Sequence, residues 1–72
     1  METINITTEY IKLQDLLKLA SLVSTGGEAK LAILDGEATV NGEVCTQRGK
    51  KIRPDDTVVF RGHELTVKYA DQ

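Results

Sequence analysis

Apolar residues recur along the first part of the chain with the period of an α-helix. Between residues 11 and 20 they fall three, one and three positions apart, the spacing of one buried helical face, at Leu13, Leu16, Leu17 and Ala20. We therefore predict a first helix over residues 12–20. Residues 1–10 carry β-forming side chains in loose alternation, which fits either an extended lead-in or a short edge strand.

A second helix is predicted over residues 26–34, with its buried face formed by Ala29, Ala32 and Ile33. Thr25 and Glu28 have the spacing of a capping box, in which a hydroxyl and a carboxylate satisfy unpaired amides at a helix N-terminus. Gly36 is suited to the left-handed position that follows many helices. The pair Gly26–Gly27 costs about 1 kcal/mol per residue relative to alanine. Either an external group approaches the backbone there, or the first helix packs closely against it.

The second half of the chain alternates in the manner of short β-strands. Residues 37–40 and 43–46 flank Asn41–Gly42, a dipeptide typical of a type I′ hairpin turn. Residues 47–51 are too polar for the centre of a strand and are predicted to form a loop. Further strands are expected over residues 57–60 and 64–69. Together the patterns predict an α+β fold, with two N-terminal helices packed on a small, mainly antiparallel β-sheet.

The length of 72 residues allows one small domain, over residues 1–72. Only three side chains are aromatic, so the core must be mainly aliphatic. Two of these aromatics, Phe60 and Tyr69, occupy strand positions that we expect to face the core. A domain that recognises RNA bases by stacking needs aromatic side chains on an exposed sheet face, and this chain has too few for that.

Few residues are suited to catalysis or metal binding. The single cysteine, Cys45, cannot form an internal disulfide and is typical of a reducing compartment, so we expect a cytoplasmic protein. With one histidine, His63, the chain has little with which to activate a nucleophile. Cys45 is predicted to be buried or half-buried and His63 to lie at the surface. No apolar run approaches the roughly 20 residues of a membrane span. We therefore expect no enzyme activity, cofactor, metal or membrane association.

The formal net charge of −2 argues against nucleic-acid binding when it is averaged over the chain, but its distribution is uneven. Residues 1–43 carry a net charge of −4, residues 44–54 carry +4, and residues 55–72 carry −2. The cations of the middle segment are Arg48, Lys50, Lys51 and Arg53. Because they repel one another, the segment is either a solvated loop or a site where these cations meet an anion.

The start of the second helix is a further candidate for anion binding. A helix N-terminus presents unpaired amides and a partial positive charge, and glycines let a phosphate come close to them. Lys30 falls on the same side of this helix as Gly26 and Gly27. A phosphate seated there would meet two amides and an ammonium group. The pattern lacks the spacing of a Walker motif.

Three segments, taken together and in this order, resemble a known RNA-binding domain. They are residues 24–30 (STGGEAK), 36–42 (GEATVNG) and 51–58 (KIRPDDTV). The domain they resemble is the one named after bacterial small-subunit ribosomal protein S-four, also called the αL motif, with the motif core at about residues 11–60. The chain is most similar to the small stand-alone bacterial members of that family.

The resemblance implies binding of structured RNA, such as ribosomal RNA, an assembly intermediate or tRNA, in a basic groove. Together with the charge pattern it predicts an RNA-binding site formed by Lys12, Lys18, Thr25, Gly26, Gly27, Lys30, Arg48, Lys50, Lys51 and Arg53. Such contacts recognise phosphates and RNA shape more than base sequence. The chain departs from the family at Gly26, where an arginine is usual. Loss of that guanidinium removes a bidentate phosphate contact, which puts the affinity or the target in question.

Two classes of function fit these observations. The first is a non-catalytic RNA-binding protein, expected to be monomeric. The second is a protein-interaction adaptor, which binds a partner through its acidic surface or a sheet edge, while the basic segment only affects solubility. Charge reversal at Lys50 and Lys51 separates the two, because RNA binding depends on these cations only in the first.

Overall fold

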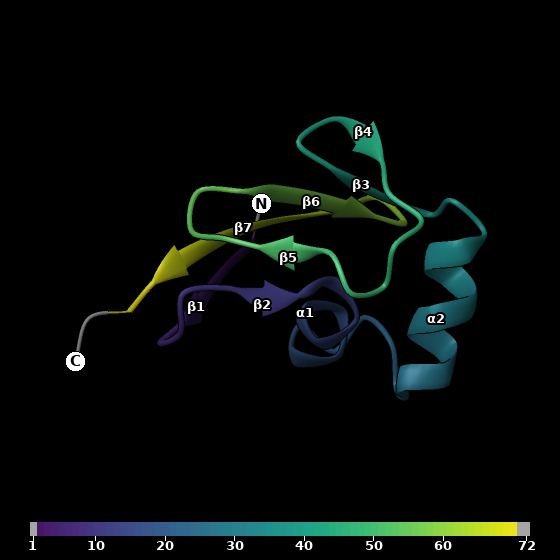
Figure 1. The fold of residues 1–72 in the computed structure, drawn as a ribbon, viewed down its shortest axis with the longest axis horizontal. Helices are drawn as coiled ribbons and strands as arrows, with labels where there is room; N and C mark the ends of the chain where they lie inside the picture. The colour runs from purple at the N-terminus through teal and green to yellow at the C-terminus, as the bar shows by residue number, and fades with distance from the viewer. Residues whose placement is uncertain (1, 71–72) are drawn as a thin grey trace.

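Two helices are followed by short strands, as predicted, and two further strands precede them. In the computed structural model, which describes residues 2–70, the elements are β1 (Glu2–Ile6), β2 (Ile11–Lys12), α1 (Leu13–Leu19), α2 (Gly26–Leu34), β3 (Ala38–Val40), β4 (Glu43–Val44), β5 (Lys51–Ile52), β6 (Thr57–Phe60) and β7 (His63–Tyr69). Figure 1 shows the longer strands running along the long axis of the molecule, with α1 seen almost end-on below them and α2 at one end. The predicted α+β class is confirmed.

The main sheet has five strands in the order β1-β7-β6-β3-β4. Its pairs are antiparallel except for β1 and β7, which run parallel with Glu2 opposite Leu65 and Ile6 opposite Tyr69. The N-terminal residues therefore form an edge strand, one of the two predicted alternatives; Met1 lies outside the residues described. The hairpin turn is also confirmed, because Asn41 (φ 51°) and Gly42 (φ 88°) both have the positive φ of a type I′ turn.

A second, two-stranded sheet was not predicted. Its antiparallel strands are β2 and β5, with Ile11 opposite Ile52 and Lys12 opposite Lys51. The predicted loop over residues 47–51 is therefore wrong at Lys51, and the first helix begins one residue later than predicted because Lys12 lies in β2. Two residues per strand are too few for an alternating pattern to appear in the sequence. The pairing of distant segments determines this sheet, and Ile52 anchors it in the core with no exposed surface.

The second helix has the predicted bounds and the predicted N-terminal cap. The Glu28 amide donates to Thr25 Oγ1 at 3.0 Å, and Glu28 Oε1 accepts from the Ser24 amide at 2.8 Å. The carboxylate thus reaches back one residue further than in an ideal capping box, which pairs it with the Thr25 amide.

Gly36 ends the second helix as predicted, with a φ of +80°. The Gly36 amide donates to Ile33 O at 3.1 Å and the Glu37 amide to Ala32 O at 3.2 Å. These two bonds form a Schellman motif. No helix within residues 2–70 is long and apolar enough to cross a bilayer.

The core is aliphatic around a single aromatic ring, that of Phe60. Its buried members are Ile6, Leu13, Leu16, Leu17, Val23, Ala29, Ala32, Ile33, Ala38, Val40, Ile52, Val58, Phe60, Leu65 and Val67. Phe60 confirms its prediction, but Tyr69 is 56% exposed and its predicted core position is wrong. β7 extends beyond its pairing with β6, which ends at Thr57 and Thr66. At Tyr69 only β1 lies alongside, so no second layer covers the ring.

Candidate nucleic-acid interface

The N-terminus of α1 is hydrogen-bonded to the basic segment of the chain. The Leu13 amide donates to Lys50 O at 2.9 Å, and the Gln14 amide donates to Arg48 O at 3.0 Å. The first amides of a helix have no acceptor within the helix. The N-cap residue, Lys12, makes no side-chain cap. Backbone carbonyls of the basic segment take that place, and they fix the segment against the helix.

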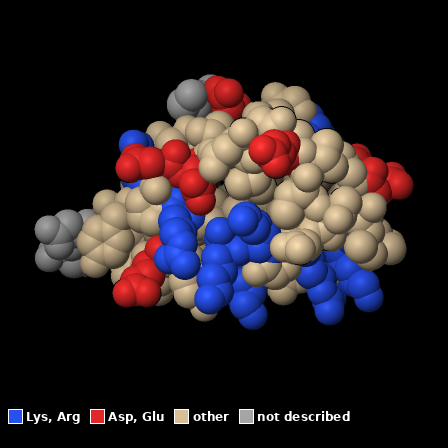
Figure 2. All heavy atoms as spheres, turned by 45° about the horizontal axis from the view of Figure 1, so that its top comes forward, with Lys and Arg blue, Asp and Glu red and all other residues tan. Residues whose placement is uncertain are grey.

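As a result, Lys12 of β2 lies beside the four cations of residues 48–53. The five cations are Lys12, Arg48, Lys50, Lys51 and Arg53. We call them the basic strip. Lys12 and Lys51 lie opposite each other in the β2–β5 pair, and all five side chains are exposed. Figure 2 shows Lys and Arg side chains concentrated along the lower side of one face, with most Asp and Glu side chains above them or to their left.

The ion pairs of residues 2–70 use cations outside the basic strip. Arg61 donates to Glu37 through two nitrogens, at 2.8 and 3.1 Å, and lies 3.8 Å from Glu28. Hydrogen bonding from Arg61 lowers the pKa of Glu37, and the same bond raises the pKa of Arg61. Lys68 pairs with Asp55 at 2.6 Å. Within the described chain no carboxylate forms an ion pair with a cation of the strip. The positive charge of the strip is therefore available to an external anion.

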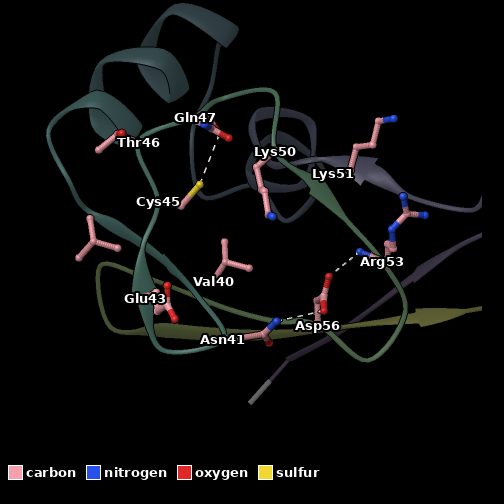
Figure 3. A pocket seen from close by; sticks show the side chains of 11 residues that line it. Val40, Asn41, Glu43, Cys45, Thr46, Gln47, Lys50, Lys51, Arg53 and Asp56 are labelled. Atoms are coloured by element: carbon pink, nitrogen blue, oxygen red, sulfur yellow. Dashed lines mark hydrogen bonds between the residues drawn. The ribbon is translucent and has the colours of Figure 1, made fainter.

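Tyr10 contacts the basic strip, and the sequence pattern does not predict this contact. Lys51 Nζ lies 4.9 Å and Arg53 Cζ 5.8 Å from the centroid of the Tyr10 ring, within the range of cation–π attraction. In Figure 3 the Lys51 and Arg53 side chains extend to the same side, away from Lys50. The register of β2 and β5 brings Tyr10 to this side, with Ile11 opposite Ile52. Only a prediction of that pairing could have found the contact.

A groove lies on the other side of Lys50. It has a volume of about 580 Å³ and is lined by the β3–β4 hairpin, by residues 45–47, by Lys50 and Lys51, and by Arg53 and Asp56 of the turn that precedes β6. Figure 3 shows the Lys50 side chain extending into this space. Cys45 is half-buried in its wall, as predicted, and its thiol donates to Gln47 O at 3.7 Å. His63 is exposed, also as predicted.

The remaining predicted site residues lie on the helices. Lys18 in the last turn of α1 and Lys30 in α2 are exposed, and Thr25 is the N-cap of α2. A Cβ added at Gly26 would meet nothing within 4 Å, and one at Gly27 would meet only Thr25 Oγ1 at 3.8 Å. Close packing of α1 is therefore not the reason for the two glycines. No hydrogen bond or ring contact within residues 2–70 joins this helical group to the basic strip.

The sequence model of one protein family, described as the S4 domain, matches residues 4–68. The chain belongs to this family. It is 41% identical over 58 residues to the "Putative RNA-binding protein YbcJ" of Escherichia coli, covering 81% of this chain and 83% of that protein. It is also 41% identical over 59 residues to the "Probable ribosome maturation protein RlbA" of Bacillus subtilis, with coverage of 82% and 83%.

Solved structures of other proteins confirm the fold. The solution structure of E. coli YbcJ, described as revealing an αL motif involved in RNA binding, matches with a TM-score of 0.73 and 38% identity over 94% of this chain and 87% of that one. A pseudouridylate synthase matches with a TM-score of 0.70 and 23% identity, over 78% of this chain but only 24% of its own. Ribosomal protein S4e of Thermoplasma acidophilum matches with a TM-score of 0.68 and 22% identity, over 90% of this chain and 34% of its own. In these two larger proteins the fold is shared over part of the chain.

Proposed function

We propose that this S4 domain protein binds structured RNA without catalysing a reaction, and that the basic strip makes its principal phosphate contacts. The observation that carries this proposal is a set of five exposed cations with no carboxylate partner within the described chain. Two hydrogen bonds to α1 fix the backbone of this segment. Such an arrangement costs electrostatic free energy unless an anion is bound. The names of YbcJ and RlbA support an RNA partner.

The helical group extends this interface in our proposal. Lys18, Lys30 and the open amides of Gly26 and Gly27 add phosphate contacts beyond the strip, although Gly26 replaces the arginine that is usual in the family. A-form RNA presents phosphates along both edges of its grooves, so two separate groups of donors can contact one stem. We further propose ribosomal RNA or an assembly intermediate as the target ahead of tRNA, because the name of RlbA refers to ribosome maturation. A cytoplasmic monomer fits this role.

Recognition through phosphates predicts a strong dependence on salt. If about five phosphates are neutralised, the slope of log K against log salt concentration is roughly −3.5 to −4.5. Stacking on the sheet contributes little, since Phe60 has no exposed surface. A filter-binding titration from 50 to 300 mM salt, with a ribosomal RNA fragment as ligand and tRNA as competitor, measures the slope and the preferred class of RNA.

Charge reversal tests which cations carry the binding. Lys51→Glu and the double variant Lys50→Glu/Lys51→Glu are expected to lose most RNA binding while keeping the thermal transition of the parent protein. Lys68→Glu is the matched control, because it changes the net charge as much as Lys51→Glu but lies outside the strip. If the double variant retained RNA as well as the parent does, the basic strip would not be the binding site.

A protein partner is the second candidate function, and one observation favours it. On α2, Leu31 is 69% and Leu34 57% exposed, and they lie one turn apart on the same side of the helix. Exposed leucines at this spacing are typical of a contact with another protein. The variant Leu31→Gln/Leu34→Gln is expected to leave RNA binding unchanged if the basic strip is the functional surface.

A further inference from the structure

The groove beside Lys50 has the dimensions of a small-molecule site. Its volume of about 580 Å³ lies within the range of about 300–1,000 Å³ that is usual for such sites. A paired RNA stem cannot enter it, because the two strands of a stem hold their bases against each other. A single nucleotide that has left its stem can enter, and unpaired nucleotides are the elements that proteins usually recognise in RNA.

The walls of the groove suit a nucleobase, which has apolar faces and polar edges. Val44, which is 64% exposed, and the half-buried Cys45 supply apolar surface on the hairpin side. Thr46 and Gln47 supply an exposed hydroxyl and an exposed carboxamide. In addition, the amides of these two residues have no acceptor within residues 2–70, so they are available as donors to a base.

The cations beside the groove are divided between two sides. Lys50, Lys51 and Arg53 all line the groove. The Lys50 side chain extends into it, whereas the cationic groups of Lys51 and Arg53 lie at its border, near the ring of Tyr10. A nucleotide in the groove would place its own phosphate near Lys50. The phosphates on either side of it in the chain would then reach Lys51 and Arg53. The groove is therefore continuous with the proposed path of the RNA backbone.

The wall opposite Lys50 is fixed before any ligand binds. Asn41 Nδ2 donates to Asp56 Oδ1 at 3.1 Å, and Asn41 Oδ1 accepts from the Thr57 amide at 2.9 Å. Asp56 Oδ2 accepts from the Arg53 amide at 2.8 Å. These bonds hold the hairpin tip against the turn before β6, so the groove does not have to be organised by the RNA.

We infer that this groove binds one unpaired nucleotide of the RNA, with the base inside and its phosphate on Lys50. The inference rests on the proposed function and adds a preference to it. RNA in which a stem is interrupted by a bulged nucleotide binds better than a continuous stem of the same length and charge.

Three RNA hairpins with the same stem test this preference in a fluorescence-anisotropy titration of the whole protein. One is fully paired, one has a single bulged nucleotide, and one has an abasic residue at the bulge. The bulged hairpin is expected to bind on the order of tenfold more tightly than the paired one, as burial of a base with two hydrogen bonds implies. The abasic hairpin is expected to lose most of that gain. A free nucleoside monophosphate competes weakly if the site serves RNA and strongly if it serves free nucleotides, which would overturn the inference.

The outcomes separate this inference from the proposed function. Equal affinity for the paired and bulged hairpins, with the steep salt dependence retained, overturns the groove as a nucleotide site and leaves the basic strip as the RNA-binding surface. Absence of binding to every hairpin overturns the proposed function itself.

A variant and a chemical probe locate the nucleotide in the groove. Thr46→Trp fills the groove from an exposed position and is expected to remove the preference for the bulge while paired RNA still binds. Thr7→Trp, at an exposed position outside the groove, is the matched control. Cys45 is the only cysteine, so its rate of alkylation reports on the groove even if the Trp variant does not fold. Bulged RNA is expected to slow this reaction at least threefold and paired RNA to leave it unchanged; equal rates with both would contradict the inference.

Discussion

The side-chain amide of Asn41 donates a hydrogen bond to Asp56, 15 residues further along the chain, at 3.1 Å. Two of the three segments that carry the family resemblance meet at this contact, since Asn41 belongs to GEATVNG and Asp56 to KIRPDDTV. The Thr57 amide donates in return to Asn41 Oδ1. The conformation of the hairpin tip thus depends on the later turn, and the functional groups of Asn41 are engaged within the protein.

Removal of the Asp56 carboxylate is expected to destabilise the fold. In Asp56→Ala the Arg53 amide and the Asn41 side chain both lose their acceptor. The expected decrease in the free energy of unfolding is about 1–3 kcal/mol, measured by urea denaturation. Asp55→Asn is the control, because Asp55 makes an exposed ion pair, and asparagine tolerates its positive φ of 76°. It should cost less than about 1 kcal/mol.

Alanine at two glycines is expected to have opposite effects on stability. Gly36→Ala forces a side chain into a φ of +80° and should lower the free energy of unfolding by about 1–2 kcal/mol. Gly26→Ala meets no neighbouring atom and should raise it by up to about 1 kcal/mol. If a phosphate approaches the Gly26 amide, the added methyl group hinders that approach. The same variant then weakens RNA binding roughly threefold to tenfold, the range for one lost hydrogen bond. Unchanged affinity in Gly26→Ala would remove the start of α2 from the interface.

Tyr10 is expected to position Lys51 and Arg53 for RNA. Tyr10→Leu should weaken RNA binding by about fivefold, because cation–π attraction at an exposed site contributes about 0.5–1 kcal/mol per cation. Tyr10→Phe keeps the ring face and should bind as the parent does. Filter binding at one salt concentration compares the two. Equal losses in both variants would assign the effect to the hydroxyl group instead of the ring.

The ion pair between Glu37 and Arg61 predicts a dependence of stability on acid pH. Because Arg61 lowers the pKa of folded Glu37, the pair stabilises the fold when the pH is above the unfolded value, about 4.3. The contribution declines as the pH falls below that value and is gone below the folded pKa. Urea midpoints at pH 7 and pH 3 should therefore differ less in Glu37→Gln than in the parent protein. An identical pH dependence in both proteins would show that this pair does not contribute.

The sequence predicts the helices and the hairpin well because their signals are local. The bounds of α2 follow from Thr25 and Gly36, whose side chain and φ act within a few residues. The β2–β5 pair joins segments about 40 residues apart through two residues on each side. No local sequence pattern predicts such a pairing. Tyr69 was misplaced because alternation along β7 does not tell where the neighbouring strand ends.

In the candidate site, too, the sequence predicts the local features and not those that depend on distant segments. Clustering of Arg48, Lys50, Lys51 and Arg53 is visible in the sequence. The carbonyl capping that fixes this segment to α1 is not, because any residue type can supply a backbone carbonyl. The orientation of Lys50 toward the groove, opposite to that of Lys51, likewise depends on the β2–β5 register.

The parallel pairing of β1 with β7 has a consequence for the order of folding. Within residues 2–70, the first strand to be synthesised, β1, pairs only with the last, β7. Until β7 has been synthesised, β1 has no strand to pair with, although its residue Ile6 is only 5% exposed in the native protein. The helices and the β3–β4 hairpin do not depend on β7 in this way, because their own backbone pairing lies within residues 13–44. The helices and the hairpin can therefore form before β7 is synthesised, whereas the β1 edge of the sheet forms only afterwards.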